Sequence, residues 1–219
     1  ALSITLLLII IKNLHWIGLP KEVTEATKPY LSISAWSMIP YMIFLTMRGV
    51  SDGFSKTSYA MGAILLGNVV NVVFNYLLIY GKFGFPAMGL EGAAVASMIA
   101  RIAMLMTLIY FLFKNEALWP FIVEGYQTAL ELPLVKKILQ LAIPSSLQMF
   151  FEASAFSIAA LIMGRVGKNE QAAHQIALSL SSMTFLIATG LAMAATIRVS
   201  NQLGKNDKVG MKMAGTSAL

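Results

Sequence analysis

Residues 59–113 read YAMGAILLGNVVNVVFNYLLIY GKFGFPAMG LEGAAVASMIARIAMLMTLIYFLF, two long apolar runs separated by a short turn. The hydrocarbon core of a bilayer is about 30 Å thick and needs roughly 20 helical residues to cross it. Each run is long enough, so we predict membrane-spanning helices at about 59–80 and 90–113. The turn between them is rich in glycine, aromatic residues and proline, which is typical of a short interfacial loop.

The same apolar pattern recurs on both sides of this pair. Further spans are predicted at about 29–50, 138–163 and 172–197, and residues 2–11 resemble the end of another. The chain is 58% hydrophobic and 12% charged, whereas soluble domains carry about 25% charged residues. We therefore predict an all-α polytopic membrane protein, which excludes a soluble enzyme and a disordered chain. Both ends of the chain lie in apolar or small-residue segments, so we expect an interior fragment whose helices pack against the rest of the same polypeptide.

The net charge of +6 does not indicate a nucleic-acid partner, because the basic residues are spread along the connections without a basic run. In membrane proteins such residues lie at the cytoplasmic ends of helices, where they contact anionic lipid. The connections on one side carry nine Lys or Arg, and those on the other, at 12–28, 81–90 and 164–170, carry six. The richer set, predicted to be cytoplasmic, comprises 48–56, 114–137 and 198–212. The longest of these polar segments, 114–137, is the best candidate boundary between two halves.

A single carboxyl group, Glu152, lies near the middle of the predicted span at 138–163, about two turns after Pro144, which is placed in the first turns. Gln148 lies one turn before it on the same helix face. A carboxyl at membrane depth must be neutral, paired with a buried cation, or holding an ion. A structural carboxyl that is hydrogen-bonded within the bundle is the alternative interpretation.

Three amides, at Asn68, Asn71 and Asn75, form one stripe on the predicted helix at 59–80. Such a stripe can line a hydrated cavity, coordinate a cation through its amide oxygens, or hold a neighbouring helix by hydrogen bonds. For Asn71 and Asn75 both interpretations stay open, and for Asn68 the structural one is favoured.

Two basic side chains raise a similar choice. Arg101 lies one turn after Ser97. Its side chain either extends so that the charged group reaches the membrane interface, or it is a buried cation paired with an acid. His174 is either a helix-end residue or a proton relay.

Nothing in the sequence predicts an enzyme. Cysteine is absent, which excludes a thiol nucleophile and a cysteine metal site. The sequence also lacks a phosphate-binding loop, an HExxH pair and any nucleophile signature.

Three ordered blocks resemble the MATE (multidrug and toxic compound extrusion) transporters. The first is NVVFNYLLIYG at 71–81 with FPAMGLEGAAVAS at 85–97, similar to that family's fifth and sixth helices. The second, PSSLQMFFE at 144–152, resembles the start of the seventh helix. The third runs from AAHQIA at 172–177 to IRVSNQLG at 197–204 and is similar to the eighth helix and the loop after it.

The resemblance implies twelve helices in two six-helix lobes. Residues 1–113 would hold the later helices of the N-terminal lobe, 114–137 the cytoplasmic connection, and 138–219 the first helices of the C-terminal lobe. The implied activity is export of small cationic amphiphilic compounds in exchange for Na⁺ or H⁺ by alternating access. It implies no cofactor beyond that coupling ion, and it places the protein in the inner (plasma) membrane.

The resemblance also implies roles for particular residues. The cation-binding carboxylate of the seventh helix falls on Glu152, near Gln148, with Na⁺ as a candidate ligand. The paired polar residues of the fifth helix fall on Asn71 and Asn75, and the sixth-helix hydroxyl falls on Ser97. Some family members have an acid where this chain has Asn75, and the amide lowers the negative charge there.

Two other functions are considered. A lipid-linked oligosaccharide flippase of the related superfamily needs a cationic cavity for its diphosphate, and only Arg101 offers such a charge within the spans. A membrane enzyme that modifies lipid needs a paired acid or a nucleophile in the spans, and the sequence shows neither.

Overall fold

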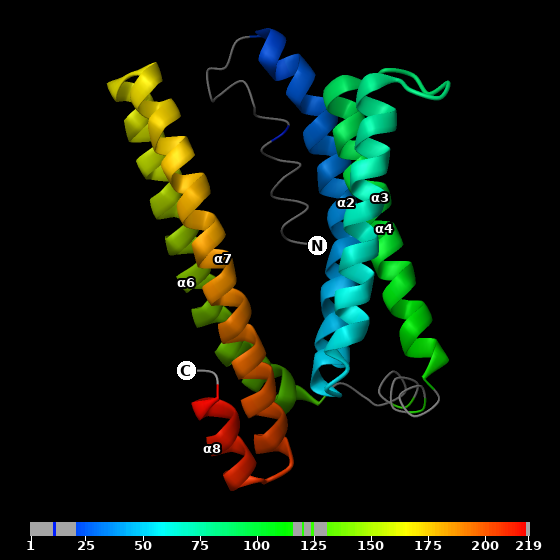
Figure 1. The fold of residues 1–219 in the computed structure, drawn as a ribbon, viewed down its shortest axis with the longest axis vertical. Coiled ribbons are helices and arrows are strands. Elements are labelled where there is room, and N and C mark those ends of the chain that lie inside the picture. The colour runs from blue at the N-terminus through cyan, green and yellow to red at the C-terminus, as the bar shows by residue number, and fades with distance from the viewer. Residues whose placement is uncertain (1–10, 12–20, 116–119, 121–123, 125–130, 218–219) are drawn as a thin grey trace. The chain divides into compact units, whose positions relative to one another are not determined.

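The regular structure of the chain is α-helical throughout the part that the computed structural model describes, residues 11, 21–115, 120, 124 and 131–217 (Figure 1). The helices are α2 (Lys21–Gly53), α3 (Thr57–Tyr80), α4 (Gly89–Lys114), α6 (Leu132–Val166), α7 (Lys168–Gly204) and α8 (Lys208–Thr216). Within these described residues, five helices are long and apolar enough to cross a membrane. The prediction of an all-α polytopic membrane protein is confirmed. The predicted partial span at 2–11 lies outside the described residues, Ile11 excepted. His15, which the sequence places beside Trp16 at the membrane interface, also lies outside them.

The helices are longer than the spans predicted from hydropathy. The polar connection expected at 12–28 is helical from Lys21 onward, and the loop expected at 164–170 is reduced to Gly167 between α6 and α7. The basic segment at 198–212 is helical up to Gly204 and again from Lys208 onward. Hydropathy marks only the apolar part of a helix, whereas backbone hydrogen bonds continue through polar residues that favour helix, such as Lys, Glu and Gln.

The start of α6 corrects the placement of Pro144. The sequence placed this proline in the first turns of its span, but α6 begins at Leu132, so Pro144 lies about three turns inside the helix. The helix begins where Pro133 occupies its first turn, a position where the missing N–H of proline costs nothing. Helix α2 likewise continues through Pro29 and Pro40.

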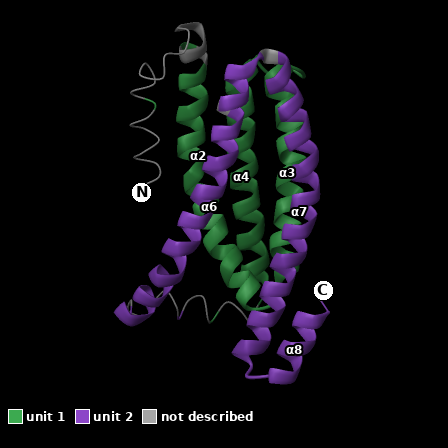
Figure 2. Ribbon diagram, turned by 90° about the vertical axis from the view of Figure 1, so that its left-hand side faces the viewer, with its two compact units in different colours: residues 1–121 green, residues 122–219 purple. Residues whose placement is uncertain are grey.

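The chain divides into two compact units, Ala1–Phe121 and Ile122–Leu219, coloured separately in Figure 2. The first unit contains α2, α3 and α4, and the second contains α6, α7 and α8. The assignment of 114–137 as a cytoplasmic connection between two lobes stays a prediction, because helix positions alone do not identify the sides of a membrane.

Small residues hold α3 and α4 together in the first unit. Gly67 of α3 faces Met104 and the Ala100 carbonyl oxygen of α4, and Gly92 of α4 lies against the Leu78 carbonyl of α3. In lipid, helix association depends on close packing, since lipid tails are as apolar as the side chains. The buried side chains of the described residues all lie in this unit. They are Ala35, Ser37, Phe44, Ser51, Ala60, Ala63, Leu78, Ala94, Ala96, Ala100, Leu105, Leu108 and Leu112.

We expect Gly92→Ala to destabilise the intact protein by about 1–3 kcal/mol, the usual effect of overpacking. The added carbon would lie 2.7 Å from the Leu78 carbonyl oxygen and 2.8 Å from its carbonyl carbon, and backbone atoms cannot rotate away. The measurement is the thermal unfolding midpoint in detergent. The control is Gly190→Ala on α7, where an added carbon meets nothing within 4 Å. Equal midpoints for both variants would contradict the close contact between α3 and α4.

The second unit leaves its apolar side chains uncovered. None of the described residues of α6 or α7 is buried, and Phe150, Phe151 and Leu186 are each more than half exposed. Two long helices joined at Gly167 cannot enclose each other, so these faces are available to lipid or to further helices. Several hydroxyl groups of α7 donate to carbonyls one turn earlier in the same helix, for example Ser179 to the Gln175 carbonyl at 2.8 Å.

Candidate functional site

The amide stripe predicted on α3 is partly joined to α4. Asn75 donates from Nδ2 to Oδ1 of Asn71 at 3.0 Å, and Asn71 donates from Nδ2 to Oγ of Ser97 at 3.5 Å. We call these three residues the amide chain. All three are half-buried, whereas Asn68, one turn earlier on α3, is exposed. The structure therefore brings together the three residues that the sequence proposed as a cavity lining, and it leaves Asn68 outside them.

The amide chain ends in an acceptor. Oδ1 of Asn75 is buried and has no hydrogen-bond partner among the described residues. A buried amide oxygen without a partner is costly, because it has lost water without replacing it. A donor or a cation at this position would satisfy it. Asn71 therefore connects two helices, while Asn75 presents a free oxygen at the end of the chain.

Arg101 lies one helical turn after Ser97 on α4 and interacts with α2. Its guanidinium donates to Oγ of Ser37, and its carbon Cζ lies 5.1 Å from the ring centroid of Tyr41. The Ser37 hydroxyl donates in turn to the Ser34 carbonyl at 2.7 Å. The side chain of Arg101 is half-buried, and no described carboxylate lies within ion-pair distance of it.

The role of Arg101 stays a prediction. In the described residues its guanidinium contacts α2 and is not paired with an acid. Sequence reasoning also missed Ser37 and Tyr41. The available signal was the occurrence of hydroxyl side chains in an otherwise apolar span, since a buried hydroxyl needs a partner.

Glu152 and Gln148 lie four residues apart on α6, on one face of the helix. Both side chains are exposed, and neither forms a hydrogen bond or ion pair with the described residues. Their exposure follows from the two-helix architecture of the second unit. The carboxylate is therefore available to whatever lies against this face of α6.

Among the described residues, no three His, Asp or Glu side chains cluster together. A Na⁺ ion near Glu152 stays a prediction. His174 lies in the second turn of α7, is half-buried, and has a buried Nε2 without a hydrogen-bond partner in the described residues. These observations do not decide whether His174 is a helix-end residue or a proton relay.

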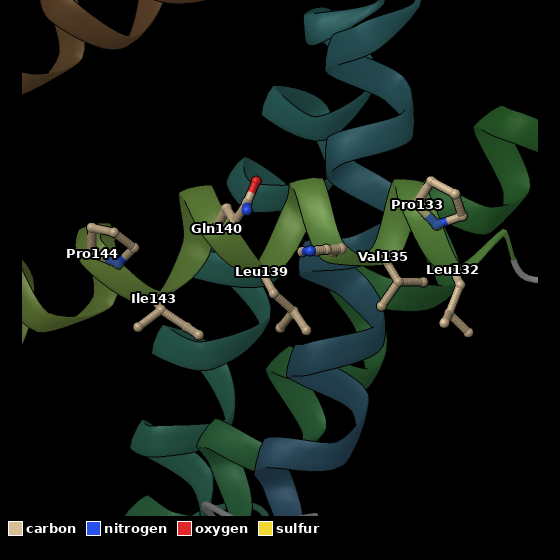
Figure 3. A pocket seen from close by; sticks show the side chains of 8 residues that line it. Leu132, Pro133, Val135, Leu139, Gln140, Ile143 and Pro144 are labelled. Carbon is tan, nitrogen blue, oxygen red and sulfur yellow. The ribbon is translucent and has the colours of Figure 1, made fainter.

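An open groove runs along the first turns of α6 (Figure 3). Leu139 and Ile143 point to one side of the helix, and Gln140 points to the other. Its lining is mostly apolar and comes from one helix, so polar groups do not converge on a common point. The groove therefore lacks the features of a specific ligand site. Its lining residues are Leu132, Pro133, Val135, Lys136, Leu139, Gln140, Ile143 and Pro144.

Comparison with known proteins gives one consistent family. The sequence profile of the MatE family matches residues 1–77 and 144–219. The chain is similar to the probable multidrug resistance protein NorM of Rhizobium meliloti, with 34% identity over 92% of this chain and 43% of that protein. It is also similar to the multidrug resistance protein NorM of Aliivibrio fischeri, with 32% identity over 90% of this chain and 43% of the relative. The probable multidrug resistance protein NorM of Pasteurella multocida is 35% identical over 89% of this chain and 42% of its own length. The chain thus spans about two fifths of these relatives.

Proposed function

Because the chain belongs to the MatE family, we propose that the intact protein exports small cationic amphiphilic compounds in exchange for Na⁺ or H⁺. The family consists of multi-pass membrane transporters and not of enzymes, as expected from the sequence. We place the protein in the inner (plasma) membrane. Its export activity, coupling ion, substrates and lipid contacts are parts of this proposal.

The observation that carries the proposal is the mid-helix carboxylate of Glu152, which has no partner in the described residues. No other residue between 138 and 163 is charged. Ionisable groups inside membrane helices are rare, because burying a charge in lipid is costly. They occur where they serve an ion or substrate pathway. Glu152 with Gln148 on the same face offers oxygen ligands to Na⁺, and the carboxylate alone could take up a proton.

The proposed mechanism is an exchange at Glu152. A coupling ion enters from outside and neutralises the carboxylate, and its release to the cytoplasm leaves the carboxylate free again. A ligand shifts a conformational equilibrium only by its differential affinity for the two states. The environment of Glu152 must therefore differ between the outward-open and inward-open states. Asn71, Asn75 and Ser97 would line the cavity of the other lobe.

We expect efflux to follow an imposed ion gradient. The test reconstitutes the intact protein in vesicles and follows a fluorescent organic cation under a Na⁺ gradient and, separately, under a proton gradient. One gradient should drive accumulation of the dye, and the matching ionophore should abolish it. Transport that neither gradient drives would contradict the proposed coupling.

The flippase alternative is tested in the same vesicles by movement of a lipid-linked oligosaccharide. Movement of that lipid without movement of the dye would favour the alternative over the multidrug transporter.

A further inference from the structure

We propose that Arg101 is a substrate-binding residue, and that it binds the carboxylate of amphiphilic compounds that carry both a positive and a negative charge. The inference rests on the proposed function, because it names a class among the compounds exported. It concerns the first unit and does not depend on Glu152.

The position of Arg101 makes its charge costly. It lies twelve residues after Gly89 and thirteen before Lys114, in the middle of α4. At 1.5 Å per residue, either end of the helix is roughly 20 Å away, too far for the side chain to reach. A charged group at this depth faces the bundle interior or a water-filled cavity and serves a pathway or a ligand.

The contacts of Arg101 in the first unit do not compensate its charge. A guanidinium has five N–H donors, and the described residues provide one acceptor, the hydroxyl oxygen of Ser37. The ring of Tyr41 covers part of its face at 5.1 Å. A hydroxyl and an aromatic ring each offset only a fraction of a full charge. The partner that fits the planar donor pair of a guanidinium is a carboxylate, which can accept two parallel hydrogen bonds.

The amide chain lies close to Arg101 along the helices. Its end at Asn75 suits a cationic group, whereas Arg101 suits an anionic one. Helices α3 and α4 are antiparallel, since Gly92 contacts Leu78 near one end and Gly67 contacts Ala100 farther along. Asn71 is at the level of Ser97. Asn75 is therefore one turn away on one side, and Arg101 is one turn away on the other. Four residues in each direction separate them by about 12 Å along the helix axis.

Asn75 and Arg101, at the two ends of this row of polar residues, complement a compound with two opposite charges. The buried Oδ1 of Asn75 lacks a donor among the described residues, and an ammonium or another cationic N–H group would satisfy it. The guanidinium of Arg101 lacks an anion in the same part of the chain. A purely cationic compound would satisfy the first end and be repelled by the second. The juxtaposition favours compounds with a carboxylate in addition to their positive charge.

The test compares two dyes that differ only at one carboxyl group. Rhodamine 110 carries a free benzoate beside its cationic ring system, and rhodamine 123 carries the methyl ester of that benzoate. Binding of each to the purified intact protein is measured by fluorescence anisotropy. We expect the wild type to bind the acid at least about tenfold more tightly than the ester, and Arg101→Gln to reduce this ratio to near one. The affinity for the ester should stay the same or rise in Arg101→Gln, because the substitution removes a positive charge that repels a cation.

The matched control is Lys114→Gln, which removes the same charge from the exposed end of the same helix. Lys114 also lies over a tyrosine, with Nζ 5.8 Å from the Tyr110 ring centroid. The Lys114→Gln variant should retain the preference for the dye with the free carboxyl group. Arg101→Lys keeps the charge but loses the planar donor pair, so its preference should fall partway while the ester affinity is unchanged. If Arg101→Gln does not fold, Arg101→Lys decides the question by the same ratio.

Two results would overturn the inference. Equal binding of both dyes by the wild type would mean that the guanidinium is already neutralised, for example by a carboxylate from outside the described residues. An equal loss of affinity for both dyes in Arg101→Gln and Arg101→Lys would mean that Arg101 only supports the packing of α2 against α4. An acid preference that depends on Arg101 in a protein without gradient-driven efflux would contradict the proposed function and leave the inference intact.

Discussion

Glu152→Gln is expected to abolish ion-driven efflux while the intact protein still folds and inserts. Glutamine has the same shape as glutamate and keeps an oxygen at the site, but it has neither a negative charge nor a titratable proton. Removing one member of a buried charge pair costs about 3 kcal/mol or more, which is roughly a hundredfold in the affinity for a bound cation. The measurement is the initial rate of dye accumulation under the driving gradient, in vesicles with matched amounts of protein.

The control for this variant is Glu170→Gln in the first turn of α7. Glu170 is exposed and lies beside Gly167, at the junction between the two long helices of the second unit. Glu170→Gln removes a carboxylate near the end of a span, whereas Glu152→Gln removes one in the middle, so efflux in the control should be unchanged. Unaltered efflux in Glu152→Gln, or an equal loss in both variants, would show that Glu152 does not hold the coupling ion.

Asn71→Leu is expected to lower substrate transport by about tenfold, the second largest effect. The substitution removes the hydrogen bond to Ser97 and also the oxygen that accepts from Asn75, so two polar partners lose their contacts at once. Each buried polar group left without a partner costs about 1–3 kcal/mol. The readouts are the concentration dependence of transport and the thermal unfolding midpoint, which separate a loss of binding from a loss of folding.

Asn68→Leu is the matched control for this prediction. It makes the same substitution on the same helix, one turn earlier, at an exposed side chain outside the amide chain. Its transport should equal that of the wild type. If both variants transport normally, the amide chain does not contribute to the substrate cavity. If both fail and unfold early, the amides of α3 serve folding instead.

The sequence predicted the α-helical membrane fold well, because the cost of burying backbone groups in lipid leaves few solutions. Apolar runs long enough to cross a bilayer must become helices, and the five long helices confirm this. Their ends were predicted less well. Polar residues from Lys21 to Lys28 continue α2, and α6 begins six residues before the predicted span. The energy of helix formation does not change sharply where hydropathy does.

The candidate site was predictable in its residue types but not in its contacts. Spacing alone placed Asn71 and Asn75 on one face, and the structure adds the hydrogen bond from Asn71 to Ser97 on the neighbouring helix. The role of Glu152 stays a prediction, because a helix with one long neighbour in its unit does not show what faces its carboxylate.

By itself, the amino-acid sequence determined that this chain lies in a membrane as a series of helices, and it identified the polar side chains that need a partner there. Both follow from local properties, the length of apolar runs and the cost of burying charge, which a single chain segment carries within itself. Only the tertiary structure decided that Arg101 meets Ser37 and Tyr41 across sixty or more residues of chain, without an acid among the described residues. Such a contact depends on how closely two helices approach and in which register. That is set by small residues packing against a neighbour, and no single segment specifies its neighbour.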